Sequence, residues 1–175
     1  MEVTTQCDGT RGRTAGFFLP LYGTTHCIYN SRKKSHTMFE FHRNERARQL
    51  RPSLSRSWLL VRANSSEEVF EEAFESEADS IIIDLEDGCP AEEKDVAREQ
   101  VVRMLNSGVV AWVRINAITT EHWWKDVKAL KNVKGLRGVM LATAEHATDI
   151  DRTAAELPPG TPIIALIESA LGVHH

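Results

Sequence analysis

The sequence is poor in cysteine: Cys7, Cys27 and Cys89 are its only three in 175 residues. Their odd number and the lack of CxxC or Cys/His ligand spacing indicate neither a disulfide framework nor a zinc site. A reducing compartment suits such a chain best, and we predict a cytoplasmic protein. The sequence also lacks any run of about 18 apolar residues, so no membrane span is expected.

Positive charge is scarce after residue 57, where eleven Lys/Arg stand against 21 Asp/Glu, whereas residues 1–57 hold ten against four. Residues 1–55 show no strand or helix periodicity, and we predict a basic, disordered or non-native extension. A transit peptide, a nucleic-acid-binding arm and a start codon placed too early are the alternatives. Acidic residues disfavour the first, and Arg32-Lys33-Lys34 alone indicates nucleic acid only weakly. We therefore expect no nucleic-acid or membrane partner.

Residues 56–175 alternate between apolar runs and helical patterns. Strands are predicted to begin near residues 57, 80, 110, 138 and 162, which lie 23 to 30 residues apart, close to the roughly 30 residues of a βαβ unit. Helical patterns fill the four gaps. One helix is predicted to open at Pro90 and to stop at Asn106-Ser107-Gly108, and another to be capped by Thr148 with Asp151. This rhythm predicts an α/β domain with a parallel sheet.

The length of this region limits the architecture. A complete (β/α)8 TIM barrel takes about 250 residues, and residues 56–175 supply only five strands and four helices. We therefore predict the amino-terminal part of a TIM barrel and expect a truncated chain. An open half barrel would expose a strand edge and apolar side chains.

Charged residues follow three of the predicted strands. Asp84, Glu86 and Asp87 come after the apolar run 81–83, Arg114 after the run 110–113, and Glu168 after the run 163–167. Parallel strands end at the same edge of a sheet, and barrel enzymes place their chemistry at that edge. These residues are therefore candidates for a functional site.

Four motifs follow one another along residues 56–175, and they are Arg56-Ser57-Trp58-Leu59-Leu60-Val61, Asp84-Leu85-Glu86-Asp87-Gly88 with Lys94 and Arg98, Val113-Arg114-Ile115-Asn116, and Ala165-Leu166-Ile167-Glu168-Ser169-Ala170-Leu171-Gly172. In this order they resemble the CoA ester lyases of the HpcH/HpaI aldolase and citrate lyase superfamily, in particular the citrate lyase beta subunit. The resemblance implies a magnesium-dependent barrel that cleaves citryl, malyl or citramalyl thioesters by a retro-Claisen reaction. It also implies an acyl-CoA or acyl carrier protein partner and a homo-oligomer, a trimer or hexamer.

The resemblance also assigns roles to residues. Glu168 would bind the metal, since a hard carboxylate oxygen suits Mg²⁺. Arg114 would be catalytic and substrate-binding, with its planar fork on an oxyanion or carboxylate. Glu86 and Asp87 would be catalytic residues that hold waters beside the metal. Arg56 would bind substrate.

Each assignment has a structural alternative. Glu168 would also be favoured before a helix by the helix dipole, and Asp87 would also cap the helix that opens near Pro90. Arg114 would also form a structural ion pair with the acidic cluster. Lys94 and Arg98 lie one turn apart and are predicted to form a solvated helix face, with contacts to CoA phosphates as the alternative.

Some positions depart from the family pattern. Val61-Arg62-Ala63 replaces Val-Pro-Gly, Ala142-Thr143 replaces Pro-Lys, and the family's second metal carboxylate, an aspartate on the sixth strand, has no counterpart. Two other functions therefore stay open: an inactive half-barrel fragment, and a pyruvate-type class II aldolase. Such aldolases usually carry histidine where this chain has Asp87.

Overall fold

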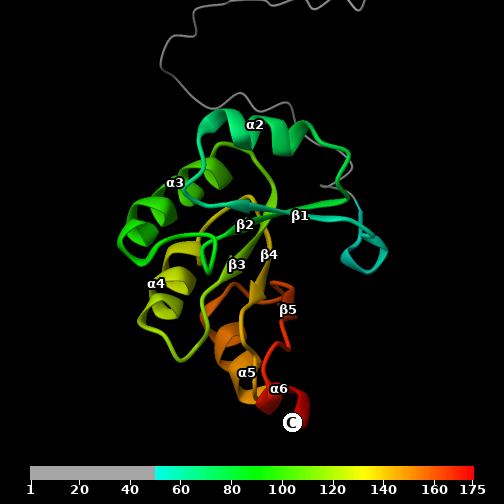
Figure 1. Cartoon of the computed structure of the whole chain (residues 1–175), viewed down its shortest axis with the longest axis vertical. Helices are drawn as coiled ribbons and strands as arrows, with labels where there is room; N and C mark the ends of the chain where they lie inside the picture. Colours follow the sequence, from blue (N-terminus) through cyan, green and yellow to red (C-terminus); the bar gives the residue numbers. More distant parts are fainter. Residues whose placement is uncertain (1–49) are drawn as a thin grey trace, which may run out of the picture. The chain divides into compact units, whose positions relative to one another are not determined.

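The computed structural model describes residues 50–175, in which strands and helices alternate (Figure 1). The elements are η1 Pro52–Leu54, β1 Trp58–Arg62, α2 Glu67–Glu75, β2 Ser80–Asp84, η2 Ala91–Glu93, α3 Lys94–Asn106, β3 Ala111–Ile115, α4 Glu121–Leu130, β4 Leu136–Leu141, α5 Ala147–Glu156, β5 Ile163–Ala165 and α6 Ala170–His174, where η marks a 3₁₀ helix. Most of the predicted extension, residues 1–49, lies outside the described part, so its boundary at residue 55 stays a prediction.

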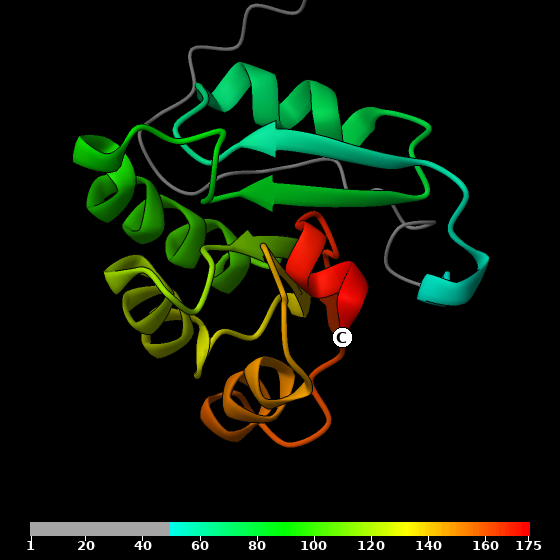
Figure 2. The ribbon, with the colours of Figure 1, turned by 60° about the horizontal axis from the view of Figure 1, so that its bottom comes forward.

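The five strands form one parallel sheet in the order β1-β2-β3-β4-β5. Each of α2, α3, α4 and α5 joins two neighbouring strands, and together they follow an arc along one face of the sheet (Figures 1 and 2). Sequential strand order with helices on one face is the wall of a (β/α) barrel, since doubly wound sheets carry helices on both faces. The predicted amino-terminal part of a TIM barrel, with five strands and four connecting helices, is confirmed.

The hydrophobic core lies between the sheet and these helices. Strand residues that alternate along the chain point into it, and each helix contributes an apolar stripe. Its fully or nearly fully buried members include Phe70, Ile81, Ile83, Val101, Leu105, Val113, Ile115, Val127, Leu130, Val139 and Leu141. The helices predicted in the second and third gaps between strands are confirmed as α3 and α4. The predicted cap of α5 is wrong, because His146 is its N-cap and Asp149 accepts the N–H of His146.

The opposite face of the sheet holds a smaller apolar cluster around Trp112. The Trp112 side chain is 1% exposed and packs with Ile82 and Met140, while the ring of Trp58 meets it edge-on at 5.5 Å between centroids. Gly138 is the register partner of Trp112 on β4, and a Cβ there would collide with the indole ring and lie 2.7 Å from the Pro162 carbonyl oxygen. The glycine therefore makes room for the tryptophan.

We expect Gly138→Ala to lower the free energy of unfolding by about 1–3 kcal/mol, because the added methyl group overpacks a filled space. Urea denaturation monitored by tryptophan fluorescence measures this loss. A midpoint equal to that of the wild type would show that Trp112 does not lie across Gly138.

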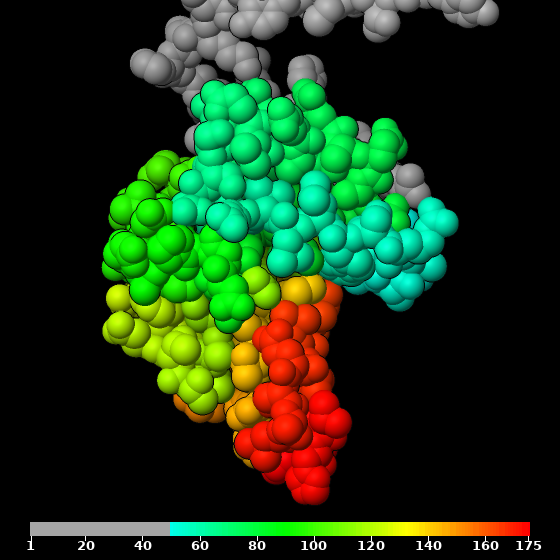
Figure 3. Space-filling view, in the orientation of Figure 1, coloured from blue at the N-terminus to red at the C-terminus, as the bar shows by residue number. Residues whose placement is uncertain are grey.

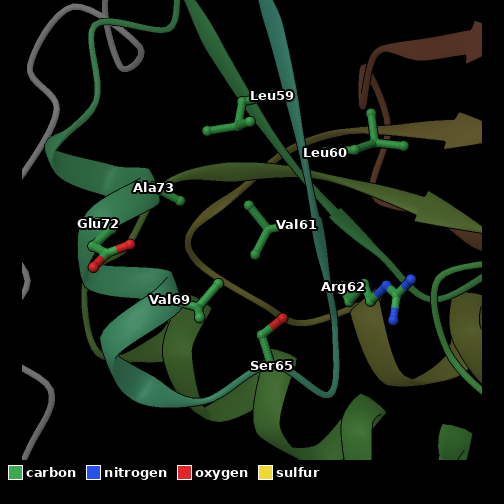
Figure 4. A pocket seen from close by; sticks show the side chains of 8 residues that line it. All are labelled: Leu59, Leu60, Val61, Arg62, Ser65, Val69, Glu72 and Ala73. Carbon is green, nitrogen blue, oxygen red and sulfur yellow. The ribbon is translucent and has the colours of Figure 1, made fainter.

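Strand β1 is a free edge among the described residues. A groove of about 410 Å³ runs between β1 and α2, where Leu59 and Val61 point toward the helix and Leu60 and Arg62 point to the other face (Figure 4). Leu59 is 37% exposed and Leu60 46%.

At the other end of the sheet, the carboxyl-terminal residues project from the rest of the surface (Figure 3). No helix in residues 50–175 has both the length and the apolar character needed to span a bilayer.

Candidate functional site

A buried ion pair joins the carboxyl ends of β2 and β3. Asp84 and Arg114 end up side by side because the parallel register pairs them directly. Arg114 donates from Nε to Oδ1 of Asp84 at 2.7 Å and from Nη2 to Oδ2 at 2.6 Å, while the two side chains are 13% and 5% exposed. A bidentate pair of this kind fixes the plane of the guanidinium. The ion pair predicted as the structural alternative for Arg114 is therefore present.

Asp84 also organises the turn that leaves β2. Its two oxygens accept the N–H of Glu86 at 3.0 Å and of Gly88 at 2.8 Å. Burial acts to raise the pKa of the Asp84 carboxyl, but the hydrogen bonds from Arg114 and Glu86 outweigh burial and hold the pKa below its ordinary value. The hydrogen bond to Asp84 in turn raises the pKa of Arg114. Both groups therefore stay charged at neutral pH.

We expect Asp84→Asn to lower the free energy of unfolding at pH 7 by about 3 kcal/mol, because the largely buried Arg114 charge then keeps only its longer contact with the Glu86 carboxylate. A lowered pKa in the folded state contributes stability above the unfolded pKa of about 4 and loses it as the pH falls through the folded value. The gap between wild type and variant should therefore shrink below about pH 4. Thermal unfolding from pH 2 to 7 measures it, and a gap independent of pH would contradict the assignment.

Glu86 lies beside the same guanidinium. Its Oε2 is 3.3 Å from Nη1 of Arg114 and accepts the N–H of Asp87 at 2.9 Å. Burial raises the pKa of the Glu86 carboxyl, and the Asp87 N–H and the Arg114 charge offset this only in part. A carboxylate with a raised pKa beside a fixed cation is suited to accept and return a proton.

Asp87 is exposed at the tip of this turn. The N-cap of η2 is Pro90 and that of α3 is Glu93, so the alternative in which Asp87 caps this helix is wrong. The Asp87 carboxylate stays close enough to raise the pKa of both Arg114 and Glu86. Asp84, Glu86, Asp87 and Arg114 thus form one charged group at this edge of the sheet.

Lys94 and Arg98 are buried, so the predicted solvated face is wrong. Lys94 donates to the backbone of the β2 turn and to Asn116, and Arg98 donates from Nε to Asp126 at 2.8 Å and from Nη1 to Asp95 at 2.6 Å. Both buried cations are stabilised by hydrogen bonds to oxygen atoms of neighbouring segments, namely the turn after β2, Asn116 and Asp126. This also leaves neither residue on the surface for CoA phosphates.

Glu168 is exposed and lies three residues beyond the end of β5, not directly after the strand as predicted. Its Oε1 accepts the N–H of Thr143 at 2.8 Å and the Thr143 hydroxyl at 3.2 Å. Thr143 has a φ of 47° in the loop between β4 and α5. Glu168 precedes Ser169, whose hydroxyl caps α6. The carboxylate is thus held by the loop that follows another strand, β4. Only its place after a strand could have pointed to Thr143 in the sequence.

The chemistry of Glu168 fits a magnesium ion held by one protein carboxylate. Thr143 anchors Oε1, and among residues 50–175 both hydrogen bonds of this side chain fall on that oxygen rather than on Oε2. Within residues 50–175, no three His, Cys, Asp or Glu side chains are grouped so that they could hold a metal. Mg²⁺ can be bound with so few protein ligands, because it usually keeps several water ligands and is otherwise held by one or two carboxylates and the substrate.

Arg56 lies at the other end of the sheet. It precedes β1, its side chain is 81% exposed, and its Nε is 3.8 Å from Oδ2 of Asp79, which also accepts the Arg56 N–H at 2.8 Å. Asp79 precedes β2, so this contact is at the amino-terminal edge of the sheet. The structure therefore brings Arg114, Glu86 and Asp87 together but does not bring Arg56 to them.

Comparison with known proteins points to one family. The family model for HpcH/HpaI aldolase/citrate lyase matches residues 56–175. A (3S)-malyl-CoA thioesterase of Cereibacter sphaeroides is 33% identical over 119 residues, which are 66% of this chain and 41% of that protein. The citrate lyase subunit beta of Escherichia coli is 29% identical over 140 residues, 71% of this chain and 46% of that one. The chain thus spans less than half the length of these curated relatives.

Solved structures agree with this. The protein CitE of Mycobacterium tuberculosis in complex with magnesium and pyruvate is 30% identical with a TM-score of 0.58, covering 69% of this chain and 48% of that one. The same protein with magnesium, acetoacetate and coenzyme A has a TM-score of 0.57 at 30% identity, covering 69% and 43%.

Proposed function

Because the chain belongs to the HpcH/HpaI aldolase/citrate lyase family, we propose that it acts in the magnesium-dependent cleavage of a 3-hydroxyacyl-CoA ester. The observation that carries the proposal is the Arg114 guanidinium, fixed by Asp84 on two atoms beside Glu86 at the carboxyl edge of the sheet. Two relatives support the proposal, since one is a malyl-CoA thioesterase and the other a citrate lyase subunit, and CitE supports it by its complex with magnesium, acetoacetate and coenzyme A.

The reaction requires one group that takes a proton and one that stabilises an oxyanion. In retro-Claisen cleavage the 3-hydroxyl loses its proton, the C2–C3 bond breaks, C3 becomes a carbonyl carbon, and the bonding electron pair moves into the thioester enolate. Protonation of C2 then gives the shorter acyl-CoA. Arg114 donates two of its five N–H groups to Asp84. Its other Nη–H groups would donate to the enolate oxygen or to a substrate carboxylate.

Glu168 would hold the magnesium ion through its Oε2. When bound, the ion would supply Lewis-acid polarisation of the substrate's oxygens and so favour loss of the hydroxyl proton. Glu86 and Asp87 would hold water at this edge of the sheet, and the raised pKa of Glu86 would suit its carboxylate to receive the hydroxyl proton. Acyl carrier protein in place of CoA, the substrate contact of Arg56 and a trimeric or hexameric assembly stay predictions.

Thioester hydrolysis is a second candidate, because the (3S)-malyl-CoA thioesterase is 33% identical to this chain. In hydrolysis, water attacks the thioester carbonyl carbon, the C–S bond breaks, and free CoA and a free hydroxy acid are released. Cleavage of the C2–C3 bond leaves the thioester intact. The two activities therefore differ in whether CoA leaves free or acylated.

Incubation of the purified chain with malyl-, citramalyl- and citryl-CoA, with Mg²⁺ or with EDTA, tests the proposal. Chromatography of the CoA species should show acetyl-CoA, formed together with glyoxylate, pyruvate or oxaloacetate respectively, in the magnesium samples only. Free CoA as the sole product would favour the thioesterase. Unchanged substrate in every sample would contradict both activities and leave the inactive half barrel.

A further inference from the structure

Lys94 is a buried cation without a carboxylate partner in residues 50–175. The residue is 7% exposed, and its Nζ donates to the carbonyl oxygens of Leu85 at 2.6 Å and Glu86 at 2.6 Å and to Oδ1 of Asn116 at 2.8 Å. An ammonium has three donors, and all three are used. A buried cation that loses a hydrogen bond is strongly destabilised. Movement of any of the three acceptors away from the Lys94 ammonium is therefore costly, and the lysine holds them in place.

Two of these acceptors are consecutive carbonyls of the turn that carries Glu86. On the other side of the same turn, Asp84 accepts the N–H of Glu86 and of Gly88. The peptide groups of the turn are thus held by Lys94 through their oxygens and by Asp84 through their N–H groups. Glu86 extends from this doubly held backbone toward Arg114.

The third acceptor connects the turn to β3. Asn116 lies two residues after Arg114, and its Nδ2 donates to Leu85 O at 3.0 Å and to Oδ2 of Asp126 at 2.7 Å. Asp126 also accepts the Asn116 N–H at 3.0 Å. The ends of β2 and β3 are therefore joined twice, by the Asp84–Arg114 pair on the charged side and by the Lys94–Asn116 contacts beneath it.

We propose that Lys94 is a positioning residue for the candidate site: its ammonium sets the path of the Leu85–Glu86 backbone and thereby the place of the Glu86 carboxylate beside Arg114. The effect of Lys94 on turnover rests on the proposed function, whereas its effect on the turn does not. Lysine suits the task because three acceptors surround one nitrogen, an arrangement that a planar guanidinium does not match.

Hydrogen exchange of the free protein tests the inference without any substrate. Lys94→Met keeps the aliphatic stem but removes the donors, and Lys128→Met, at an exposed lysine of α4, is the matched control. In Lys94→Met the amides of Glu86 and Gly88 should exchange about tenfold faster, while those of β4 keep their protection. Equal exchange in wild type and variant, or a uniform rise across the sheet, would overturn the inference. If Lys94→Met fails to fold, Lys94→Arg takes its place with the same expectation.

Kinetics separate this inference from the proposed function. Where the wild type cleaves a CoA ester, Lys94→Met should lower kcat about 10- to 100-fold, because Glu86 is misplaced. KM should change by less than about twofold, because Arg114 keeps its bonds to Asp84. A loss confined to KM would overturn the positioning role. A wild type without turnover would remove the proposed function, whereas the exchange result would still decide the role of Lys94 in the turn.

Discussion

Arg114→Lys is expected to reduce kcat/KM for CoA-ester cleavage about 100-fold or more, the usual scale for loss of a donor to a developing oxyanion. Lysine keeps the positive charge beside Asp84, so the carboxylate is not left alone. A single ammonium, however, does not bind both oxygens of Asp84 and also present fixed donors to substrate, as the guanidinium does at 2.6 and 2.7 Å. The loss should therefore fall on turnover, with the fold preserved.

Steady-state kinetics with circular dichroism as a fold check measures this effect. Arg103→Lys is the matched control, because Arg103 is 59% exposed on α3 and lies 3.8 Å from Glu99, away from the strand tips. It should retain wild-type turnover. Retention of activity within about threefold by Arg114→Lys would mean that the guanidinium does not contact the reacting atoms.

Glu168→Gln is expected to weaken the affinity for Mg²⁺ by about 10- to 100-fold or more. Loss of a residue that only hydrogen-bonds to a metal ligand typically costs this much, and Glu168 is proposed to be a ligand itself. Glutamine has the size of glutamate, and its Oε1 still accepts from Thr143, so the loop contact survives. What disappears is the negative charge that a hard cation requires.

Titration of the purified chain with Mg²⁺, followed by calorimetry and by turnover, measures this loss. Glu156→Gln removes a charge at a distant place on α5, where Glu156 lies 3.8 Å from Lys131, and should leave the titration unchanged. Equal Mg²⁺ affinity in wild type and Glu168→Gln would place the ion elsewhere.

The barrel wall could be predicted because its signals are local. Strands predicted near residues 57, 80, 110, 138 and 162 begin at Trp58, Ser80, Ala111, Leu136 and Ile163. Each strand is visible in the sequence as a short apolar run. A helix between two such runs returns the chain to the same end of the sheet, so neighbouring strands are parallel. The meeting of Asp84 with Arg114 follows from the same regularity, since parallel strand tips share one edge.

The rest depends on contacts between distant segments. Lys94 and Arg98 read as surface charges, because nothing near them in sequence shows the Leu85 and Glu86 carbonyls or the Asp126 carboxylate that make their burial tolerable. The apolar run 163–167 predicted a strand that reaches Glu168, yet β5 ends at Ala165. Glu168 is held instead by Thr143, whose left-handed backbone leaves no trace in composition.

Calorimetric titration of the purified chain with acetoacetate, with and without Mg²⁺, tests the central claim most directly. That claim is the proposed magnesium-dependent site, to which Glu168 and the group of Asp84, Glu86, Asp87 and Arg114 would both contribute. CitE has been solved with both of these ligands, and the titration needs no turnover. We predict saturable binding in the presence of Mg²⁺ that disappears with EDTA and weakens in Arg114→Lys. Equal binding without the ion, or no binding with it, would contradict the account.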